Sequence, residues 1–579
     1  MKAESALAAR PLTIRRRAPG APDRLPPSLH PVLRRVYAAR GVGRAEELSL
    51  ELRQLLPVST LDGIGAATGL LLDHLRRGSR ILVVGDFDAD GATSCALVLR
   101  QLRRIGHGPV AFRVPDRQRH GYGLTPALVA ELAPERADLL ITVDNGVSAF
   151  DGIAAAQALG MQVLVTDHHL PAAALPPCEA QVNPNLPGAA FGSPALAGCG
   201  VAFYLMAAVT RAVTEQRSEP QPAVAELLDL VALGTVADLV PLDHNNRILV
   251  QEGLRRIRAR LATPGLMALA RVAGCRLDEL TTRQLGHQIA PRLNAAGRID
   301  DMSVGIRCLL TDDPAEALAL AGTLDRLNRE RRELELRMRD EAVAAVRRIR
   351  LADGDLPPGL ALHDAGWHAG IVGLVANRLK DRLHRPVVAF APAGDGELRG
   401  SARSVAGCHV RDALEAIATR EPGLILRFGG HAMAAGLTLA PAKLARFGDA
   451  FAEEVARRLT REQMQGVIES DGELAVAELN VETATALAAG GPWGQGFPEP
   501  LFDGRFDVIE SRVVGDRHLK LWLRPGPDAR PVEAIAFGHF DEGHRARPTD
   551  GATLTLAYRL QTSTYGGQAR AELLVEYLQ

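Results

Sequence analysis

Three stretches in the first half of the chain are apolar almost without interruption until they reach an aspartate. They read ILVVGD at 81–86, LLITVDNG at 139–146 and VLVTDHH at 163–169. Segments of about ten to twenty residues with helical periodicity separate them. Continuous apolar strands that alternate with helices are typical of a parallel sheet with both faces covered. The pattern therefore predicts an α/β fold whose polar residues lie at the carboxyl ends of the strands, where such sheets bind ligands.

The periodicity changes several times along the rest of the chain, and each change predicts another part. After Pro314, which suits a first helical turn, apolar residues recur every three to four positions as far as about residue 350. The strand PVVAF then marks a second α/β unit, and apolar and polar residues alternate from about residue 468, as in a small antiparallel barrel or sandwich. The predicted parts are an N-terminal helical segment at 1–75, a parallel-sheet domain at 76–311, a long connecting helix at 312–352, a second α/β domain at 353–462 and a β-domain at 463–579.

Composition is typical of a protein of the reducing cytosol. Of the 579 residues 47 % are apolar, but charges interrupt every apolar run well before it could span a membrane. No apolar stretch or small-residue cleavage site follows the N-terminal arginines, so we expect no secretory signal. The six cysteines have no CxxC spacing, which argues against a zinc site or a disulfide framework. We therefore expect a cytoplasmic protein.

The charge balance limits the ligands that can be expected. A net charge of −1 does not by itself indicate a nucleic-acid partner, so any such binding must depend on local patches. Arginine-rich runs occur at 255–260 and 326–339, and a solvated helix face explains either run equally well. No GxxxxGK[ST] motif is present, so ATP is not an expected ligand.

The first polar turn, GDFDADG, is the most unusual short motif of the chain. Its three aspartates, Asp86, Asp88 and Asp90, would repel one another unless a cation lay between them. An EF-hand calcium loop would need an acidic ligand at its twelfth position, where Leu97 stands, and would not follow a strand. A haloacid-dehalogenase-type phosphatase would have threonine in place of Ala92. The remaining interpretation is a metal site that later segments complete.

Later segments supply the residue types that such a site needs. Asp144 ends the second apolar run, Asp167, His168 and His169 end the third, and Asp238 follows in VADLVPL. Each of these residues alone could be a turn or capping residue. Together with the first motif they place at least five carboxylates and two imidazoles at one edge of a sheet. Such a set suits Mn²⁺ or Mg²⁺, and a pair of these ions is the usual means of hydrolysing phosphate esters.

The motifs, in this order, resemble those of the DHH phosphoesterase superfamily. GDFDADG, VDNG, DHH and VADLVPL are similar to its four motifs, and GWHAGIVGLVANRL, GSARS and RFGGHAMAAG resemble its companion DHHA1 domain. QIAPRLNAAGRIDD and a tail that resembles an OB-fold narrow the similarity to the RecJ-type single-strand DNA exonucleases. The resemblance covers almost all of residues 75–579. It implies a metal-dependent phosphoesterase domain, a DHHA1-like nucleic-acid-binding domain and an OB-like barrel, in that order.

The resemblance also implies that the acidic cluster binds two divalent ions. The implied metal ligands are Asp88, Asp90, Asp144, His168 and Asp238. Asp144 would bridge the ions, and these ligands would carry catalysis together with His169. His169 would face the scissile phosphate, and Asp167 would orient the two histidines.

One position departs from the family pattern. Many superfamily members carry a histidine four residues before the first metal-binding aspartate, and in this chain Val84 stands there. We expect Asp86 to supply the missing ligand, directly or through a water molecule.

Further motifs imply contacts with a DNA strand. The resemblance implies that GSARS forms a pocket for a 5′-phosphate. The glycines of GGHAMAAG would let a DNA strand approach the protein backbone closely. The implied nucleic-acid-binding residues are Arg117, Arg292, Arg298, Ser401, Arg403, Ser404, Gly429, Gly430 and His431. Taken alone, each arginine could instead form a surface salt bridge, and the histidine could be a hydrogen-bonded structural residue.

The C-terminal barrel could bind bases as OB-folds do, by stacking them on aromatic rings beside basic side chains. The candidates are Trp493, Phe497, Trp522, Phe537, Tyr558 and Tyr565, with Lys520, Arg524, Arg559 and Arg570. A small barrel also needs rings to fill its core, so the sequence does not separate the two roles.

The function implied by the resemblance is a 5′→3′ exonuclease on single-stranded DNA, with Mn²⁺ or Mg²⁺, acting in DNA repair and recombination. A single-strand-binding protein and a helicase would be its partners, without a membrane and without ATP. Two alternatives are a DHH hydrolase of small substrates and a non-catalytic nucleic-acid-binding protein with a decayed site. The additional domains argue against the first alternative, and the complete set of acidic residues argues against the second.

Overall fold

The computed structural model divides into two compact units. The metal-site unit comprises Arg44–Arg331 and Gly491–Glu499. The barrel unit comprises the described part of Met1–Gly43 together with Arg332–Gly490 and Pro500–Gln579. The structure describes residues 12–117, 119–172, 174–353, 356–393, 396–540, 546–564 and 567–579. The described residues of the N-terminal part predicted at 1–75 fall into both units, with the division between Gly43 and Arg44.

A parallel sheet forms the centre of the metal-site unit, in the strand order β3-β2-β4-β5-β6. Its strands are β2 (Ile81–Val84), β3 (Val110–Arg113), β4 (Leu139–Val143), β5 (Gln162–Thr166) and β6 (Ala180–Val182). The three apolar runs of the sequence are β2, β4 and β5. All residues of β2 and β4 are buried, which is why these strands do not alternate between apolar and polar positions. The strand order reverses between β2 and β4, and ligands bind at such switch points.

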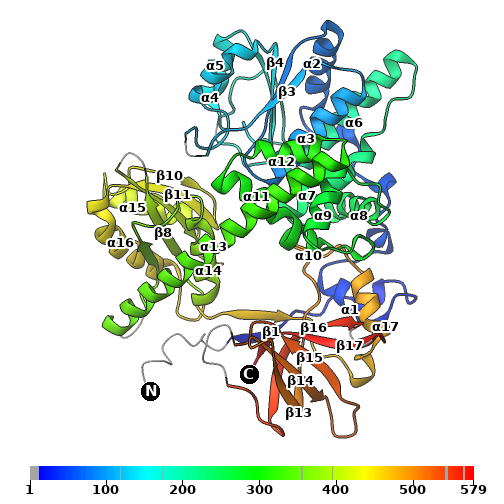
Figure 1. Ribbon diagram of the computed structural model, residues 1–579, viewed down its shortest axis with the longest axis vertical. Helices are drawn as coiled ribbons and strands as arrows, with labels where there is room; N and C mark the ends of the chain where they lie inside the picture. Colours follow the sequence, from blue (N-terminus) through cyan, green and yellow to red (C-terminus); the bar gives the residue numbers. More distant parts are fainter. Residues whose placement is uncertain are drawn as a thin grey trace. The chain divides into compact units, whose positions relative to one another are not determined.

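Helices cover both faces of this sheet (Figure 1). On one face α4 (Pro126–Leu132) and α5 (Phe150–Ala158) bury Leu128 and Ile153 against the strands. On the other face lie α2 (Ile64–Arg77), α3 (Ala89–Arg104) and α6 (Gly198–Arg217). The helices that follow are α7 (Leu228–Ala237), α8 (His244–Arg258), α9 (Pro264–Val272), α10 (Thr282–Gln284), α11 (Ala290–Ile299) and α12 (Ser303–Leu310).

A long helix, α13 (Pro314–Asp353), begins in the metal-site unit and ends in the barrel unit. A second sheet follows, in the order β10-β11-β9-β8-β7, with β7 and β8 parallel and the other neighbours antiparallel. Phe447 and Phe451 of α16 pack with Phe390 in the core of this domain. Its elements are β7 (Leu360–His363), α14 (Val372–Leu383), β8 (Val387–Pro392), β9 (Leu398–Arg403), α15 (Val410–Arg420), β10 (Arg427–Gly430), β11 (Ala434–Leu439) and α16 (Leu444–Arg458).

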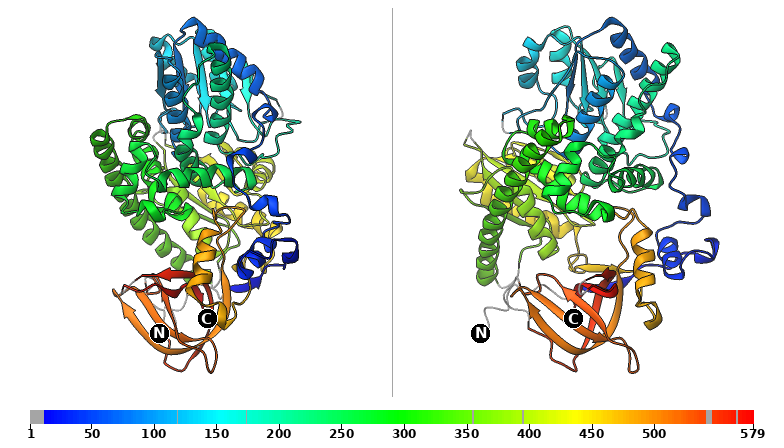
Figure 2. Two further views of the ribbon diagram at one scale, coloured as in Figure 1. Left: turned by 90° about the vertical axis from the view of Figure 1, so that its right-hand side faces the viewer. Right: turned by 45° about the vertical axis from the view of Figure 1, so that its right-hand side comes forward.

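The C-terminal strands close into a barrel in the order β13-β14-β15-β17-β16, drawn in orange and red in Figure 2. They are β13 (Phe502–Val514), β14 (His518–Arg524), β15 (Val532–Ala536), β16 (Thr553–Ser563) and β17 (Arg570–Leu578), and α17 (Val481–Ala489) precedes them. The predicted architecture, a parallel-sheet domain, a connecting helix, a second α/β domain and a C-terminal barrel, is confirmed. Among the described residues no single helix has the length and apolarity of a membrane span; one bent pair, Leu52–Thr60 with Ile64–Arg77, meets those criteria.

The start of the described chain packs with the barrel unit. Strand β1 (Thr13–Arg16) pairs in parallel with β12 (Val467–Ser470), and α1 (Pro31–Ala39) follows it. The guanidinium of Arg40 donates to both carboxylate oxygens of Asp471 at 2.7 and 2.9 Å, and the two side chains are only 2 % and 1 % exposed. This buried ion pair fixes the segment to the residues that lead into the barrel.

Candidate metal centre

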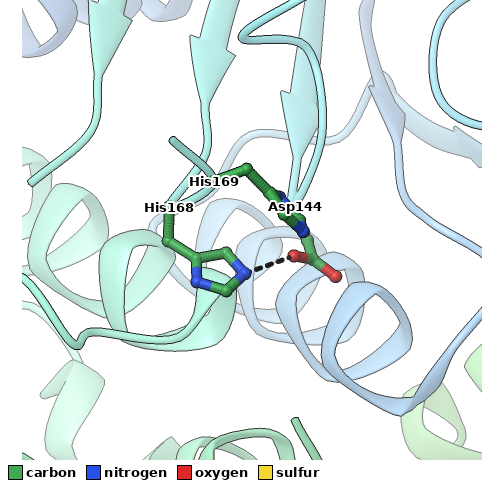
Figure 3. Close-up of side chains that lie close together, drawn as sticks. All are labelled: Asp144, His168 and His169. Atoms are coloured by element: carbon green, nitrogen blue, oxygen red, sulfur yellow. Dashed lines mark ion pairs between the residues drawn. The ribbon is translucent and has the colours of Figure 1, made fainter. Parts of the chain in front are cut away.

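The acidic and imidazole side chains of the four sequence motifs meet at the carboxyl edge of the parallel sheet. Figure 3 shows the imidazole of His168 turned toward the carboxylate of Asp144 below the ends of the strands. The Nε2 atom of His168 lies 3.1 Å from Asp144 Oδ1, 3.5 Å from Asp238 Oδ2 and 3.9 Å from Asp90 Oδ2. One nitrogen atom is thus surrounded by carboxylate oxygens from three different segments of the chain.

Three overlapping groups of side chains have the spacing of metal ligands. They are Asp90–His168–Asp238, Asp86–Asp88–Asp144 and Asp144–His168–His169, with ligand atoms within 4.8 Å of one another. Within the described part of the chain, three buried atoms of these groups have no hydrogen-bond partner, namely Asp86 Oδ1, Asp144 Oδ1 and His168 Nε2. Buried polar atoms are rarely left unpaired, so three of them within overlapping ligand groups indicate a ligand that they would bind together. Carboxylates with a single imidazole fit Mn²⁺ or Mg²⁺.

The electrostatics of the cluster also favour a bound cation. Burial raises the pKa of Asp86, Asp90, Asp144 and Asp238 above the usual range, and the charge of Asp88 raises each of them further. Burial, followed by the charge of His169, lowers the pKa of His168, which keeps its imidazole neutral, as a metal ligand must be. A divalent cation would remove the repulsion that the carboxylates otherwise relieve by holding protons.

Helix ends hold two of the aspartates in place. Asp88 is the N-cap of α3, where its Oδ1 accepts from the backbone N–H of Gly91 at 3.0 Å. Asp90 accepts from the first two N–H groups of α6, those of Gly198 at 2.6 Å and Cys199 at 2.9 Å. The positive end of α6 therefore stabilises the buried carboxylate of Asp90.

The backbone at Asp144 is strained. Its φ of +62° lies in the left-handed region that residues other than glycine seldom adopt. The next residue, Asn145, ties the ends of two strands together, because its amide donates to the carbonyls of Val84 at 3.1 Å and Val143 at 2.9 Å. Strain of this kind persists where the surroundings impose it, and it is typical of functional sites.

Asp167 orients the histidine pair. Its Oδ1 accepts from the backbone N–H groups of His168 and His169 and lies 2.8 Å from Nδ1 of His169. Burial alone would raise the pKa of Asp167, but the hydrogen bond from His169 lowers it below the usual value. Conversely, burial lowers the pKa of His169, but the hydrogen bond with Asp167 and the surrounding carboxylates raise it to about 9.

Val84 and Asp86 are two positions apart in the chain and have different surroundings. Val84 is fully buried among the apolar residues that α4 and α5 cover, so its side chain faces the core. Asp86 is 4 % exposed and belongs to a candidate metal group with Asp88 and Asp144. This geometry is compatible with Asp86 as the ligand in place of the family histidine, and the assignment stays a prediction.

Three residues that sequence analysis did not single out support the centre. Tyr122 donates its phenol hydrogen to the carbonyl of Asp144 at 3.3 Å, and its oxygen lies 3.3 Å from Nδ1 of His169. Asn294 of α11 accepts from the N–H of Ala89 at 2.8 Å. A Cβ on Gly297 would lie 1.7 Å from the carbonyl oxygen of Phe87, so α11 packs directly on the loop of the first motif. The motifs HGYG and LNAAGR contain these three residues, but a sequence motif does not show which part of the site each of them contacts.

The predicted phosphate-binding arginines of the metal-site unit have different surroundings. The guanidinium of Arg117 lies over the ring of Phe87, 4.6 Å from its centroid, beside the first motif. Arg292 is 9 % exposed and donates to Asp325 at 2.9 Å, so it is already an ion-pair partner. Arg298 is half-buried at the end of α11. Their contact with a phosphate stays a prediction.

The predicted 5′-phosphate residues lie on the second sheet. Arg403 of β9 donates to Ser401 Oγ at 2.9 Å, and a Cβ on Gly373 would lie 2.9 Å from Arg403 Nη2. Since Gly373 is the second residue of α14, the guanidinium lies beside a helix N-terminus, where anions are favoured. Ser404, in contrast, is fully buried and donates its hydroxyl to the carbonyl of Cys408 at 2.7 Å.

The glycines of the second motif in this domain lie on neighbouring antiparallel strands. Gly429 pairs with Gly436, and Gly430, whose φ is +143°, pairs with Ala435. His431 is exposed just after β10, and its N–H donates to the carbonyl of Ala434 at 2.8 Å. A Cβ on Gly429 would meet no atom within 4 Å, so the sheet surface is open at this point.

The aromatic candidates of the C-terminal region are mostly buried. Tyr558 is fully buried, whereas Phe537 is 62 % exposed. Trp493 and Phe497, 8 % and 4 % exposed, belong to the metal-site unit. Tyr565 lies outside the described residues. The ammonium of Lys520 lies 2.7 Å from carboxylate oxygens of both Glu533 and Glu572, which compensate its charge.

Fold and site together define a DHH phosphoesterase. Sequence models of three domains match: the N-terminal domain of the DHH family at 80–235, the DHHA1 domain at 356–457 and the RecJ OB domain at 470–577. The single-stranded-DNA-specific exonuclease RecJ of Dickeya dadantii is 49 % identical over 97 % of this chain and 98 % of its own length. The chain therefore belongs to the RecJ family of single-stranded-DNA-specific exonucleases, and the resemblance drawn from the sequence is confirmed.

Other relatives agree with this placement. The exonuclease RecJ of Escherichia coli is 47 % identical over 98 % of both chains. A crystal structure of RecJ from Thermus thermophilus in complex with Mn²⁺ superposes with a TM-score of 0.78 at 32 % identity, covering 96 % of this chain and 80 % of that one. A second crystal structure of that protein, in complex with Mg²⁺, superposes with a TM-score of 0.73 at 31 % identity and covers 96 % and 79 %.

Proposed function

We propose that this protein removes nucleotides from the 5′ end of single-stranded DNA with the help of two divalent ions. The observation that carries the proposal is the set of overlapping metal-ligand groups at the switch point of the parallel sheet. The curated relatives that match nearly the whole chain are named as single-strand-specific exonucleases, which supports the choice of substrate.

The residues present fit two ions that share the ligands of one centre. The two sets are Asp90, His168 and Asp238 on one side, and Asp86, Asp88 and Asp144 on the other. Mn²⁺ or Mg²⁺ bound there would polarise the phosphoryl group and acidify a water molecule. The buried oxygens Asp86 Oδ1 and Asp144 Oδ1 support this assignment, because neither has a hydrogen-bond partner among the described residues.

The remaining residues of the site hold the substrate and the ligands in position. Asp167 fixes the imidazole plane of His169 through Nδ1, and the phenol of Tyr122 contacts the same ring. A ring held in this way can face the scissile phosphate without searching among rotamers, which reduces the entropic part of the barrier. Arg117, whose guanidinium is stacked on Phe87, is a suitable cation for a neighbouring phosphate.

Selection of a 5′ end rests on the second sheet. A terminal phosphate carries more charge than an internal phosphodiester, so it favours a guanidinium beside a helix N-terminus. Arg403, Ser401 and the first turn of α14 at Gly373 form such a place. The exposed Gly429 on β10 and the exposed His431 just after it lie at one edge of the same sheet and offer a surface for the adjoining nucleotides.

The cellular setting is part of the same proposal. An enzyme of this kind would act in DNA repair and recombination, where a helicase supplies single strands and a single-strand-binding protein covers them. A cytoplasmic location is consistent with the six cysteines, all of which are free thiols.

The decisive experiment compares ends and substrates. The protein with Mn²⁺ is incubated with single-stranded DNA labelled at the 5′ or the 3′ end, with duplex DNA, with RNA and with pyrophosphate. Immediate release of the 5′ label as mononucleotide, from single-stranded DNA alone, is the expected result. Release of the 3′ label first, or hydrolysis of pyrophosphate alone, would overturn the proposal. Asp144→Asn, which keeps the shape of the side chain, is the inactive control.

A further inference from the structure

A short segment of the C-terminal region belongs to the metal-site unit. Residues Gly491–Glu499, with the sequence GPWGQGFPE, are assigned to that unit although the residues on both sides belong to the barrel unit. In sequence terms the glycines and prolines indicate a simple linker. Its two large rings are nevertheless buried, with 8 % of Trp493 and 4 % of Phe497 exposed. A linker that buries its rings must pack specifically, and we call this segment the clip.

The clip is a tight turn held by two helices. The backbone groups of Gly494 and Phe497 exchange two hydrogen bonds, of 2.9 and 3.1 Å. The rings of Trp493 and Phe497 stack, with centroids 5.2 Å apart and planes 11° apart. The guanidinium of Arg247 on α8 lies 4.0 Å above the Phe497 ring, and the hydroxyl of Thr282 on α10 donates to the Trp493 carbonyl at 2.6 Å.

The clip touches the loop that joins α7 to α8. The backbone N–H of Leu242 donates to the carbonyl of Gln495 at 2.7 Å. A Cβ on Gly494 would lie 2.7 Å from Leu242 Cδ1, and a Cβ on Gly496 would lie 3.2 Å from Pro241 Cβ. Clip and loop are therefore in direct contact at two consecutive loop residues.

That loop begins with a residue of the metal centre. Asp238 is the C-cap of α7, and its Oδ2 lies 3.5 Å from His168 Nε2. The next residue, Leu239, has a φ of +59° and is 67 % exposed, so it offers little packing to hold the loop. The position of the loop is set further along, where Asn246 donates to the carbonyl of Pro241 at 2.9 Å and where the clip lies.

We propose that the clip positions Asp238 for metal binding and that Phe497 is its principal positioning residue. The inference rests on the proposed function, since it takes Asp238 as a metal ligand. Phe497 touches no reacting atom and acts through the clip, whose carbonyl and glycines hold the two loop residues. Without the ring, Arg247 and Trp493 lose their common stacking partner, and the N–H of Leu242 loses a fixed acceptor. Groups that contact a metal ligand directly typically contribute about 10- to 100-fold in metal affinity, and the clip acts one contact further out, so we expect an effect at the lower end of that range.

The test measures Mn²⁺ affinity rather than catalysis. Mn²⁺ binding to the full chain is followed by calorimetry and by the electron paramagnetic resonance signal of the free ion. We expect Phe497→Ala to weaken one of the two binding events by about 10-fold. Phe497→Tyr, which keeps the stacked ring, should restore the affinity. Binding of single-stranded DNA in the presence of EDTA should not change in either variant.

Two controls separate positioning from general loss of stability. Leu269→Ala removes a fully buried side chain from α9 in the same unit and should leave Mn²⁺ affinity unchanged. Phe497→Ala added to Asp238→Asn should cause no further loss, because the ligand that the clip positions is already gone. If Phe497→Ala does not fold, Gly494→Ala replaces it, since its Cβ displaces Leu242 without removing a ring.

The outcomes distinguish the two proposals. Wild-type affinity in Phe497→Ala, an equal loss in Leu269→Ala, or an additive loss in the double variant would overturn the role of the clip and leave the proposed function standing. A wild-type protein that binds no Mn²⁺ at all would overturn both.

Discussion

Gly297 of α11 packs directly on the loop of the first metal-site motif, and replacing it by alanine tests how strictly that loop is placed. An added Cβ would lie 1.7 Å from the carbonyl oxygen of Phe87 and 2.8 Å from its carbonyl carbon. Phe87 stands between Asp86 and Asp88, two residues of one candidate metal group. Gly297→Ala must therefore push these carboxylates away from Asp144 or move α11.

The size of the displacement follows from the geometry. Real Cβ atoms essentially never come closer than 3.0 Å to such an atom, so helix and loop must separate by about 1.3 Å. The opposing atom belongs to the backbone, so no change of rotamer relieves the contact. Overpacking of this kind costs about 1–3 kcal/mol of stability. A misplacement of about 1 Å in a catalytic centre costs about 100-fold in rate.

The assay combines rate and stability. We expect Gly297→Ala to degrade 5′-labelled single-stranded DNA about 100-fold more slowly than the wild type at saturating Mn²⁺, with urea unfolding shifted by about 1–3 kcal/mol. The matched control is Gly69→Ala in α2, where a Cβ meets no atom within 4 Å. That control should keep its activity, and its free energy of unfolding should rise by up to about 1 kcal/mol because alanine has a higher helix propensity than glycine. A Gly297→Ala variant with the wild-type rate would refute the idea that this contact places the first motif.

Three further variants test other contacts. Asp144→Asn should lower the rate at least about 100-fold and abolish tight Mn²⁺ binding, measured by calorimetry. The melting temperature of the metal-free protein should not fall, because a buried carboxyl group with a raised pKa is replaced by a neutral amide. Tyr122→Phe removes the phenol that contacts His169 and should cost about 1 kcal/mol in activation free energy, about fivefold in single-turnover rate. Asp471→Ala leaves Arg40 buried without its carboxylate and should cost about 3–5 kcal/mol in urea unfolding.

Controls and contradicting results make these predictions specific. Asp151→Asn, at an exposed carboxylate of α5, should leave the rate and Mn²⁺ affinity unchanged. A Tyr122→Phe variant as fast as the wild type would show that the phenol does not orient the imidazole. Asp449→Ala, at an exposed position of α16, controls for Asp471→Ala, and an equal effect of the two would contradict a buried ion pair.

The parts of the site that were predictable from sequence are those that follow strands. Apolar runs identify β2, β4 and β5, and parallel strands bring their carboxyl ends to the same edge. Asp86, Asp144 and His168 can therefore be assigned to one place without any knowledge of distances. Asp238 caps the helix α7 and does not follow a strand, so the sheet argument does not place it; the sequence offered it as a further carboxylate, and the family resemblance added its role as a ligand.

What sequence did not reveal depends on contacts between distant segments. Asn294 meets Ala89 across 205 residues, and no local pattern records that distance. Arg292 has the residue type of a phosphate ligand, but only the fold shows that Asp325 already pairs with it. The sequence prediction includes the clip in the β-domain at 463–579, because no local pattern assigns its rings to the metal-site unit. The specific packing of Phe497 depends on Arg247, which the sequence places far away.

The pairing of β1 with β12 has a consequence for how the chain can be made. Leu12 donates its N–H to the phenol of Tyr577, a partner 565 positions later, and Thr13 pairs with Val467. The ribosome synthesises β1 long before either partner exists, so β1 remains unpaired while the metal-site unit is synthesised and folds. Contacts of such high sequence separation form late, because the loop that they close is long. Completion of the barrel unit should therefore be the last event of folding. In a chain that ends before residue 467, β1 would have no strand to pair with.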